Sequence, residues 1–238
     1  MKKSRYVKVG ILMALLMLVL GMTTVFAANA EKKLSQNKWV TQPDYNTYYK
    51  VTVKDDGYLT VSAKESKLSY GYINVDGYKK VGKNYNHITG ILSSDKKSAS
   101  GKFAVKKGTY YLQGTYGTQF KYTFTKAVFK ENYCASKAID LKSNKEVVVV
   151  NTPKKAYDRW YKIKLTKKQK LTFWSTGAGG ASIFDSNMKI VDVKYDDKDD
   201  TKWYSSSKLK KGTYYVRISN GAIVGFSDEP AVATFKWK

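Results

Sequence analysis

The sequence has very few of the residues on which most catalytic and metal centres depend. Among 238 residues there is one histidine, His87, and one cysteine, Cys134. A Ser–His–Asp or Cys–His centre needs a histidine beside its nucleophile, and His87 falls in a segment that we interpret as a loop far along the chain from Cys134. A zinc site lacks enough ligands. We therefore expect no enzyme, and only a carboxylate pair of the glycosidase type stays open, because 19 acidic residues are present.

Arginine is almost as scarce, although the chain is strongly basic. Only Arg5, Arg159 and Arg217 contribute to the 43 basic residues, and the formal net charge is +24. Specific recognition of phosphates and bases relies on the forked guanidinium group, so we expect no specific nucleic-acid partner. The lysines should attract polyanions in a salt-dependent way, or simply keep sheet edges soluble and unpaired.

The N-terminal 30 residues have the pattern of a secretory signal peptide. Basic residues precede an apolar run from Val9 to Leu20, and small residues follow up to Ala30. We predict cleavage after Ala30, with Ala27 as a second fitting position and an uncleaved membrane anchor as the alternative. The mature chain then carries a charge of 39 − 19 = +20 and no transmembrane segment. We expect a secreted, extracellular protein of the Gram-positive kind that can associate with the cell surface. With one cysteine it has no intrachain disulfide.

The mature sequence contains an internal repeat and no sustained helical periodicity. Matching segments recur in the same order at offsets that fall from 112 to 104, so loops rather than strands absorbed the length differences. The matched pairs are 48–53 with 160–165, 59–61 with 171–173, 73–77 with 182–186, and 106–111 with 210–215, the last pair being identical.

Within these segments apolar and polar residues alternate with a period of two, as in strands with one buried face. The residues expected to point inward are Tyr49, Val51, Val53, Tyr161, Ile163, Leu165, Leu171, Phe173, Tyr214, Val216 and Ile218. Glycines at Asp55-Asp56-Gly57, Asp76-Gly77, Lys107-Gly108 and Lys211-Gly212 are expected to supply positive φ in turns. The pattern predicts an all-β protein of two tandem antiparallel β-sandwich, jelly-roll-like domains, residues 31–127 and 128–238, each with a net charge of +10.

The second unit resembles the bacterial pre-peptidase C-terminal domain family. The resemblance rests on WYKIKL-TKKQKLTF, IFDSNMKIV, LKKGTYYVRI and ATFKW in that order, and it extends more weakly to the first unit. It implies a β-sandwich that accompanies secreted proteases and other hydrolases or occurs in surface proteins, where such domains bind polymers or assist secretion. Some members bind calcium. This chain differs because no hydrolase domain accompanies the two units.

Aromatic residues are the strongest functional signal, since flat rings stack on sugars. Those that the alternation leaves outside the core are our candidate ligand-binding residues: Trp160, Trp174, Trp203, Tyr204, Tyr215, Tyr72 and Tyr78. Calcium is the one candidate ion, because a dense acidic run, which a solvated loop explains equally well, contains Asp196, Asp197, Asp199 and Asp200.

These observations predict a non-catalytic binding protein. We expect its partner to be an extracellular polysaccharide or cell-wall polymer held by exposed aromatics and lysines. The alternatives are an adhesion module for a host or matrix protein, with or without calcium, and an accessory domain of a secreted hydrolase system.

Overall fold

The computed structural model describes residues 29–69, 71–151, 158–177, 180–198, 201–219 and 231–238. The predicted signal peptide lies almost entirely outside these residues. Within them the secondary structure is β apart from one 3-10 turn, η1 (Ala135–Lys137). The described part contains no helix long and apolar enough to cross a bilayer.

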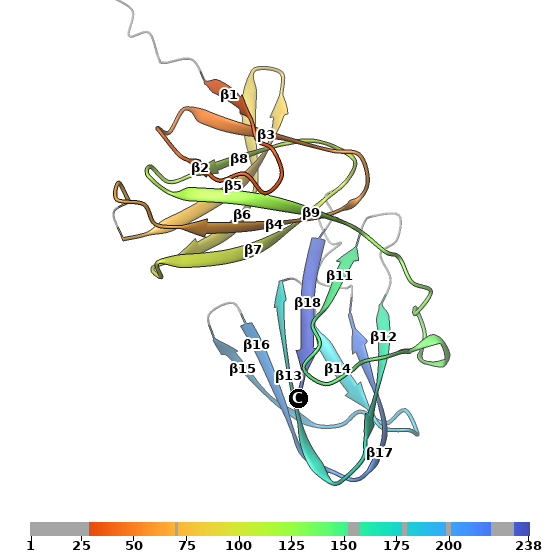
Figure 1. The fold of residues 1–238 in the computed structure, drawn as a ribbon. Coiled ribbons are helices and arrows are strands. Elements are labelled where there is room, and N and C mark those ends of the chain that lie inside the picture. Colours follow the sequence, from red (N-terminus) through yellow and green to blue (C-terminus); the bar gives the residue numbers. More distant parts are fainter. Residues whose placement is uncertain (1–28, 70, 152–157, 178–179, 199–200, 220–230) are drawn as a thin grey trace, which may run out of the picture.

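The first half of the chain forms two facing sheets (Figure 1). Sheet A has the order β1-β3-β8-β5-β6 and sheet B the order β2-β9-β4-β7. The strands are β1 (Ala30–Lys33), β2 (Val40–Thr41), β3 (Thr47–Val53), β4 (Gly57–Lys64), β5 (Ile73–Val81), β6 (Asn84–Ser94), β7 (Ser98–Val105), β8 (Gly108–Gly114) and β9 (Gln119–Lys126).

The second half repeats this arrangement. Sheet C has the order β10-β12-β17-β14 and sheet D the order β11-β18-β13-β16-β15. The strands are β10 (Ile139–Asp140), β11 (Val147–Asn151), β12 (Arg159–Leu165), β13 (Gln169–Gly177), β14 (Ala181–Phe184), β15 (Val193–Lys198), β16 (Thr201–Leu209), β17 (Gly212–Ile218) and β18 (Ala231–Trp237). The all-β sandwich prediction is therefore confirmed, with one addition: β1–β3 and β10–β12 are parallel pairs.

Strand register shows how closely the two halves correspond. Tyr49 pairs with Leu112 in the first half, and Tyr161 pairs with Val216 in the second. Tyr161 follows Tyr49 by 112 residues and Val216 follows Leu112 by 104, so one strand pair shows both offsets of the sequence repeat. The halves differ in one strand: β6 extends sheet A, whereas β15 extends sheet D. The outer face of sheet A therefore has a hairpin beside it that sheet C lacks.

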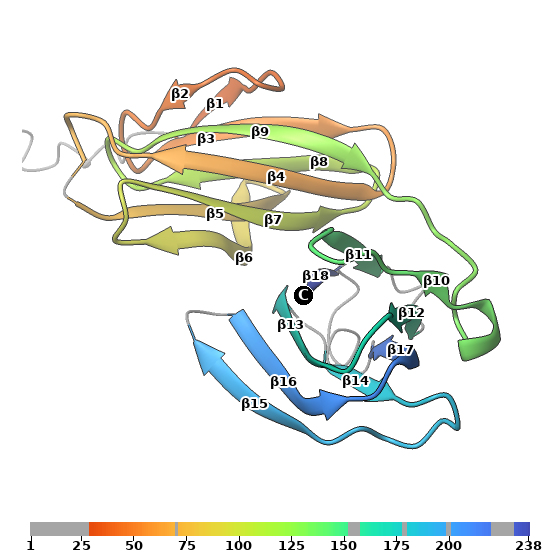
Figure 2. The same cartoon turned by 60° about the horizontal axis from the view of Figure 1, so that its bottom comes forward.

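Each pair of sheets encloses its own apolar cluster. All the residues expected to point inward are buried, the most exposed of them being Tyr214 at 9%. One cluster draws on residues from Leu34 to Tyr122 and the other on residues from Leu141 to Trp237. The halves also touch: β18 approaches β7, and Lys102 Nζ lies 2.9 Å from Glu146 Oε1 (Figures 1 and 2).

The identical Lys-Lys-Gly-Thr-Tyr-Tyr segments have the same local geometry. In the first half the backbone N–H of Lys106 donates to the Tyr110 hydroxyl at 2.8 Å, and in the second the Tyr214 hydroxyl donates to the carbonyl of Lys210 at 3.0 Å. In both, a buried tyrosine closes the turn that precedes its own strand, which explains why this tyrosine recurs at this position.

One sequence match and three turn assignments need correction. Val75 pairs with β8 at the position equivalent to the one where Ala181 pairs with β17. Asp76 therefore corresponds to Ser182, and Asp185 lies three residues beyond that position. Asp76-Gly77 lies inside β5 and is no turn. Gly57 and Gly212 also lack the expected positive φ. At Gly57 the requirement is space, because a Cβ there would lie 2.2 Å from the Thr125 carbonyl oxygen.

Candidate functional site

The predicted aromatic residues of the second unit are divided between two opposite faces. Trp160 and Tyr215 lie half-buried on the outer face of sheet C. Trp174, also half-buried, belongs to the outer face of sheet D, where its backbone pairs with that of Trp203, whose side chain lies outside the described residues. Tyr204 is wrongly predicted to be exposed, because its ring is 8% exposed and stacks on Phe173 inside the core at 4.7 Å.

In the first unit the two predicted tyrosines also lie apart. Tyr78 lies half-buried on the outer face of sheet A. Tyr72 precedes β5 and is exposed, with its hydroxyl hydrogen-bonded to Ser93.

Strand register places three aromatic side chains at equivalent positions on the outer faces of sheets A and C. Tyr111 pairs with Lys50 and Tyr78, and Tyr215 pairs with Lys162 and Phe184. Two residues before these lysines stand Tyr48 and Trp160, which point the same way. We call these sets the first aromatic face (Tyr48, Tyr78, Tyr111) and the second aromatic face (Trp160, Phe184, Tyr215).

Two rings of the second aromatic face form a compact group with a cation beside them. The Trp160 and Phe184 rings lie 5.2 Å apart, and the Arg217 guanidinium lies 5.5 Å from the Phe184 ring and 6.0 Å from that of Trp160. Asp158 Oδ2 lies 3.7 Å from Arg217 Nε. Trp160 stays partly open to solvent, whereas Phe184 is buried beneath it.

On the first aromatic face the hairpin of β5 and β6 adds a fourth ring. Two register irregularities in β5, between Val75 and Asp76 and between Gly77 and Tyr78, are the kind of bulge that bends a strand. Tyr85 of β6 then stacks on Tyr48 of β3 at 3.8 Å, although two strands separate β3 from β6 in the sheet. Tyr48 meets Tyr78 edge-on at 5.3 Å, and Tyr85 meets Tyr111 edge-on at 5.0 Å.

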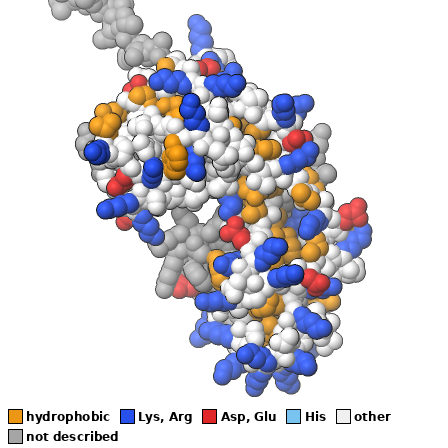
Figure 3. Space-filling view, viewed as in Figure 1, with side chains coloured by type: hydrophobic (Ala, Val, Ile, Leu, Met, Phe, Trp, Pro, Cys, Tyr) orange, Lys and Arg blue, Asp and Glu red, His pale blue; other side chains and the backbone are white. Residues whose placement is uncertain are grey.

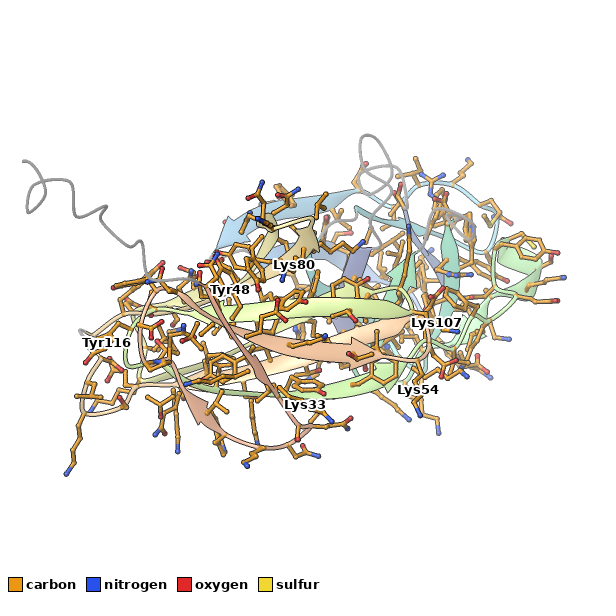
Figure 4. All side chains as sticks on the ribbon, turned by 90° about the horizontal axis from the view of Figure 1, so that it is seen from above. Lys33, Tyr48, Lys54, Lys80, Lys107 and Tyr116 are labelled. Atoms are coloured by element: carbon orange, nitrogen blue, oxygen red, sulfur yellow. The ribbon has the colours of Figure 1, made fainter. Side chains whose placement is uncertain are left out.

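A single carboxylate connects this hairpin to the first strand. Glu31 of β1 accepts a hydrogen bond from the Tyr85 hydroxyl at 2.6 Å and forms an ion pair with Lys80, and the Tyr111 hydroxyl lies 3.4 Å from its second oxygen. Figure 4 labels Tyr48 and Lys80, which come from β3 and β5 and lie close together in that view. The hydrogen bonds from Lys80 and Tyr85 lower the pKa of Glu31, which is therefore ionised at neutral pH.

Two of these tyrosines, Tyr78 and Tyr85, are held in their neutral form. Burial, then Asp76 and Tyr48, raise the pKa of Tyr78 to about 12. Burial and the hydrogen bond to Glu31 raise the pKa of Tyr85. At physiological pH both hydroxyls therefore keep their protons, and that of Tyr85 donates to Glu31.

His87 and Cys134 do not form a pair in the described residues. His87 lies in strand β6 rather than in the predicted loop, with Nε2 3.6 Å from Asp76 Oδ1 and its ring 5.5 Å from that of Tyr78. Cys134 precedes η1, in the other half, and its sulfur lies 3.2 Å from the Ser136 hydroxyl.

The acidic run starts in a strand rather than in a loop. Asp196 and Asp197 belong to β15, and the side chain of Asp197 lies outside the described residues. Asp199 and Asp200 lie outside the described residues, and among those that are described no group of three His, Cys, Asp or Glu side chains could hold a metal.

The sequence interpretation overlooked Trp39, which precedes β2 and is 38% exposed. Two cations lie over its ring, Lys64 Nζ 4.7 Å and Lys121 Nζ 5.0 Å from the ring centre. Trp39 belongs to the segment that the repeat does not cover, so the comparison of repeats could not find it.

Comparisons with known proteins assign no family to this chain. No family model matches the chain, and no curated protein matches it. The solved structure of the tandem CBM22-1 and CBM22-2 domains of Paenibacillus barcinonensis Xyn10C is 12% identical, with a TM-score of 0.28 and coverage of 83% of this chain and 84% of that one. The PBSX exported protein XepA is 10% identical, with a TM-score of 0.24 and coverage of 84% of both chains.

Tripeptidyl peptidase 2 is 15% identical, with a TM-score of 0.27. The match covers 87% of this chain but only 24% of that one, so this chain spans about a quarter of its length. At these TM-scores the likenesses carry no argument about function, which has to come from the two aromatic faces.

Proposed function

We propose that this protein is a secreted, non-catalytic binding protein whose two aromatic faces hold an extracellular polysaccharide or cell-wall polymer. The observation that supports the proposal is the recurrence of aromatic residues at three equivalent positions outside both cores: Tyr48 and Trp160, Tyr78 and Phe184, Tyr111 and Tyr215. The outer face of a sandwich sheet is usually polar. Two such faces with matching aromatics suit a ligand that repeats along its length.

The chemistry of each face fits a sugar polymer. A partly open indole or phenol ring offers a flat surface for the C–H groups of a pyranose, and neighbouring hydroxyls and amines bond to its edges. Trp160 offers this surface in the second unit, and Tyr48, stacked on Tyr85, offers its open part in the first. Lysines surround both units, as Figure 3 shows for one side of the molecule, so anionic polymers are attracted in preference to neutral ones.

The test is binding of polysaccharides by variants of the protein spanning residues 29–238. Cell-wall fractions, neutral glycans and anionic glycans are screened first by affinity electrophoresis, and the best ligand is measured by calorimetry. Trp160→Ala is expected to weaken binding by about tenfold, the loss of one stacking ring. Tyr48→Ala is expected to do the same at the first face.

Trp39→Ala is the matched control, since it removes an exposed indole that belongs to neither aromatic face. All variants are first compared by thermal unfolding. Equal losses for Trp39→Ala and Trp160→Ala, or unchanged affinity for all three folded variants, would contradict the proposal.

A further inference from the structure

A groove with a volume of about 670 Å³ opens at the edge of sheet A where β1 ends. The segment Glu31–Gln36 forms one side, and Lys50, Thr52 and Tyr122 complete the lining. Lys50 also pairs with Tyr111, so the groove continues directly from the first aromatic face. A polymer lying across Tyr48 would therefore enter this groove.

Two lysines of the groove stand directly side by side. Lys33 and Lys50 are partners in the parallel pairing of β1 and β3, on the outer face, where neighbouring strands lie about 4.8 Å apart. Like charges in paired positions of a sheet repel. In the described part of the chain neither lysine forms an ion pair, and Lys32 adds a third cation to the lining.

The second unit shows that the fold does not require this repulsion. There the equivalent pair is Asp140 and Lys162, whose charged atoms lie 3.6 Å apart. The equivalence is secure, because Leu34 donates to the Lys50 carbonyl at 2.9 Å and Leu141 donates to the Lys162 carbonyl at 2.8 Å. At the same place one unit holds a neutral pair and the other holds two cations.

The acidic residue of the groove does not neutralise these lysines fully. Glu31 is engaged by the ion pair with Lys80 and by the hydroxyls of Tyr85 and Tyr111. The charge of Lys50 also acts on Glu31, but one carboxylate faces three lysines in the lining, Lys32, Lys33 and Lys50, so positive charge is in excess. Asp44 interacts with Lys32 and so offsets part of the positive charge that Lys32 adds.

We propose that Lys33 and Lys50 form a subsite for an anionic group of the bound polysaccharide, so that the first unit selects charged glycans while the second does not. This inference rests on the proposed function, since the subsite extends the first aromatic face. The two ammonium groups and the Thr52 hydroxyl form a shallow point-charge site, which suits sulfate, phosphate or carboxylate substituents carried along a sugar chain.

The test uses one glucan in three forms: dextran, carboxymethyl-dextran and dextran sulfate. The protein spanning residues 29–238 is expected to bind both charged forms more tightly than dextran at 150 mM salt. The double substitution Lys33→Gln with Lys50→Gln should lower the ratio of the affinities for charged and uncharged dextran by about tenfold, the effect of two lost ion pairs.

The matched control is Lys67→Gln with Lys167→Gln, which lowers the net charge by the same amount at two exposed lysines that do not line the groove. Equal losses in the two double variants would show that overall charge alone attracts the polymer and would overturn the inference. So would an unchanged preference after the groove substitutions. Binding of uncharged dextran reports on the aromatic faces alone, so its loss with Tyr48→Ala and Trp160→Ala tests the proposed function independently of this subsite.

Discussion

At the scale of single residues, Glu31 links four strands of the first unit outside its core. Its carboxylate joins β1 to Lys80 of β5, to Tyr85 of β6 and to Tyr111 of β8. β1 is a short strand whose four residues are all exposed, so it buries little apolar surface of its own. We therefore expect its attachment to depend on this carboxylate.

The pH dependence of stability should report this attachment. Because the folded pKa of Glu31 lies below the ordinary value of 4.5, its contribution is complete above that value and is lost as the pH falls through the folded pKa. The hydrogen bond to Glu31 raises the pKa of Lys80 above 10.5, so the contribution of Lys80 to stability is lost only as the pH rises through its pKa in the folded protein. Glu31→Gln should lower the urea midpoint at pH 7 and leave it unchanged at pH 2. A deficit that persists at pH 2 would contradict this assignment.

The paired lysines make a second prediction at this scale. Lys33→Asp copies the Asp140–Lys162 pair of the second unit into the first and replaces a repulsion by an attraction. The free energy of unfolding should rise by about 0.5 kcal/mol at low salt, and the gain should shrink at 1 M salt. Urea titrations at both salt concentrations measure it. A stability loss at low salt would show that the two lysines do not repel in the folded protein.

At the scale of elements, the β5–β6 hairpin distinguishes the two units. Its bend brings Tyr85 over the outer face and leaves Tyr111 only 5% exposed, although Tyr111 points away from the core. In the second unit the additional strand joins the opposite sheet, and Tyr215 at the equivalent position is half-buried. The hairpin therefore decides how open an aromatic face is.

Removing the stacking ring should loosen the hairpin without unfolding the sandwich. Tyr85→Ala is expected to increase amide hydrogen exchange in β6 and β1, because it removes both the stack on Tyr48 and the hydrogen bond to Glu31. Exchange in β4 and β9 of sheet B should stay slow. Tyr195→Ala, which removes an exposed ring from β15, is the control and should leave β1 unchanged. Uniformly faster exchange throughout the first unit would instead mean that Tyr85 supports the core.

The sequence predicted those features of the elements that depend on local periodicity. Inward alternation in β3, β12 and β17 was correct, because burial of one face imposes a period of two on each strand. The match of Asp76 with Asp185 was wrong, because β5 continues past the point where β14 ends and carries bulges that sequence matching cannot see. The contact of Tyr85 with Glu31 joins residues 54 positions apart and depends on the bent hairpin, so no local sequence pattern could predict it.

At the scale of the whole molecule, the proposed function predicts that two units with related faces bind long ligands more tightly than short ones. A polymer bound at one unit presents its next repeats to the other at a high effective concentration, provided that the chain can span both faces. The contact between β7 and β18 and the ion pair of Lys102 with Glu146 place the units against each other. An exposed ion pair of this kind contributes little to stability, so we expect Glu146→Gln to change the unfolding midpoint hardly at all.

Ligand length should therefore separate one-face from two-face binding. With short oligosaccharides, Trp160→Ala is expected to reduce the number of binding sites from two to one while the affinity of the first face stays the same. With the long polymer the same substitution should weaken binding by about tenfold, because the advantage of a second attachment on one chain is lost. Calorimetry on a length series of one glycan measures both quantities. Equal losses for short and long ligands would show that only one face binds, and the two units would then differ in function despite their common fold.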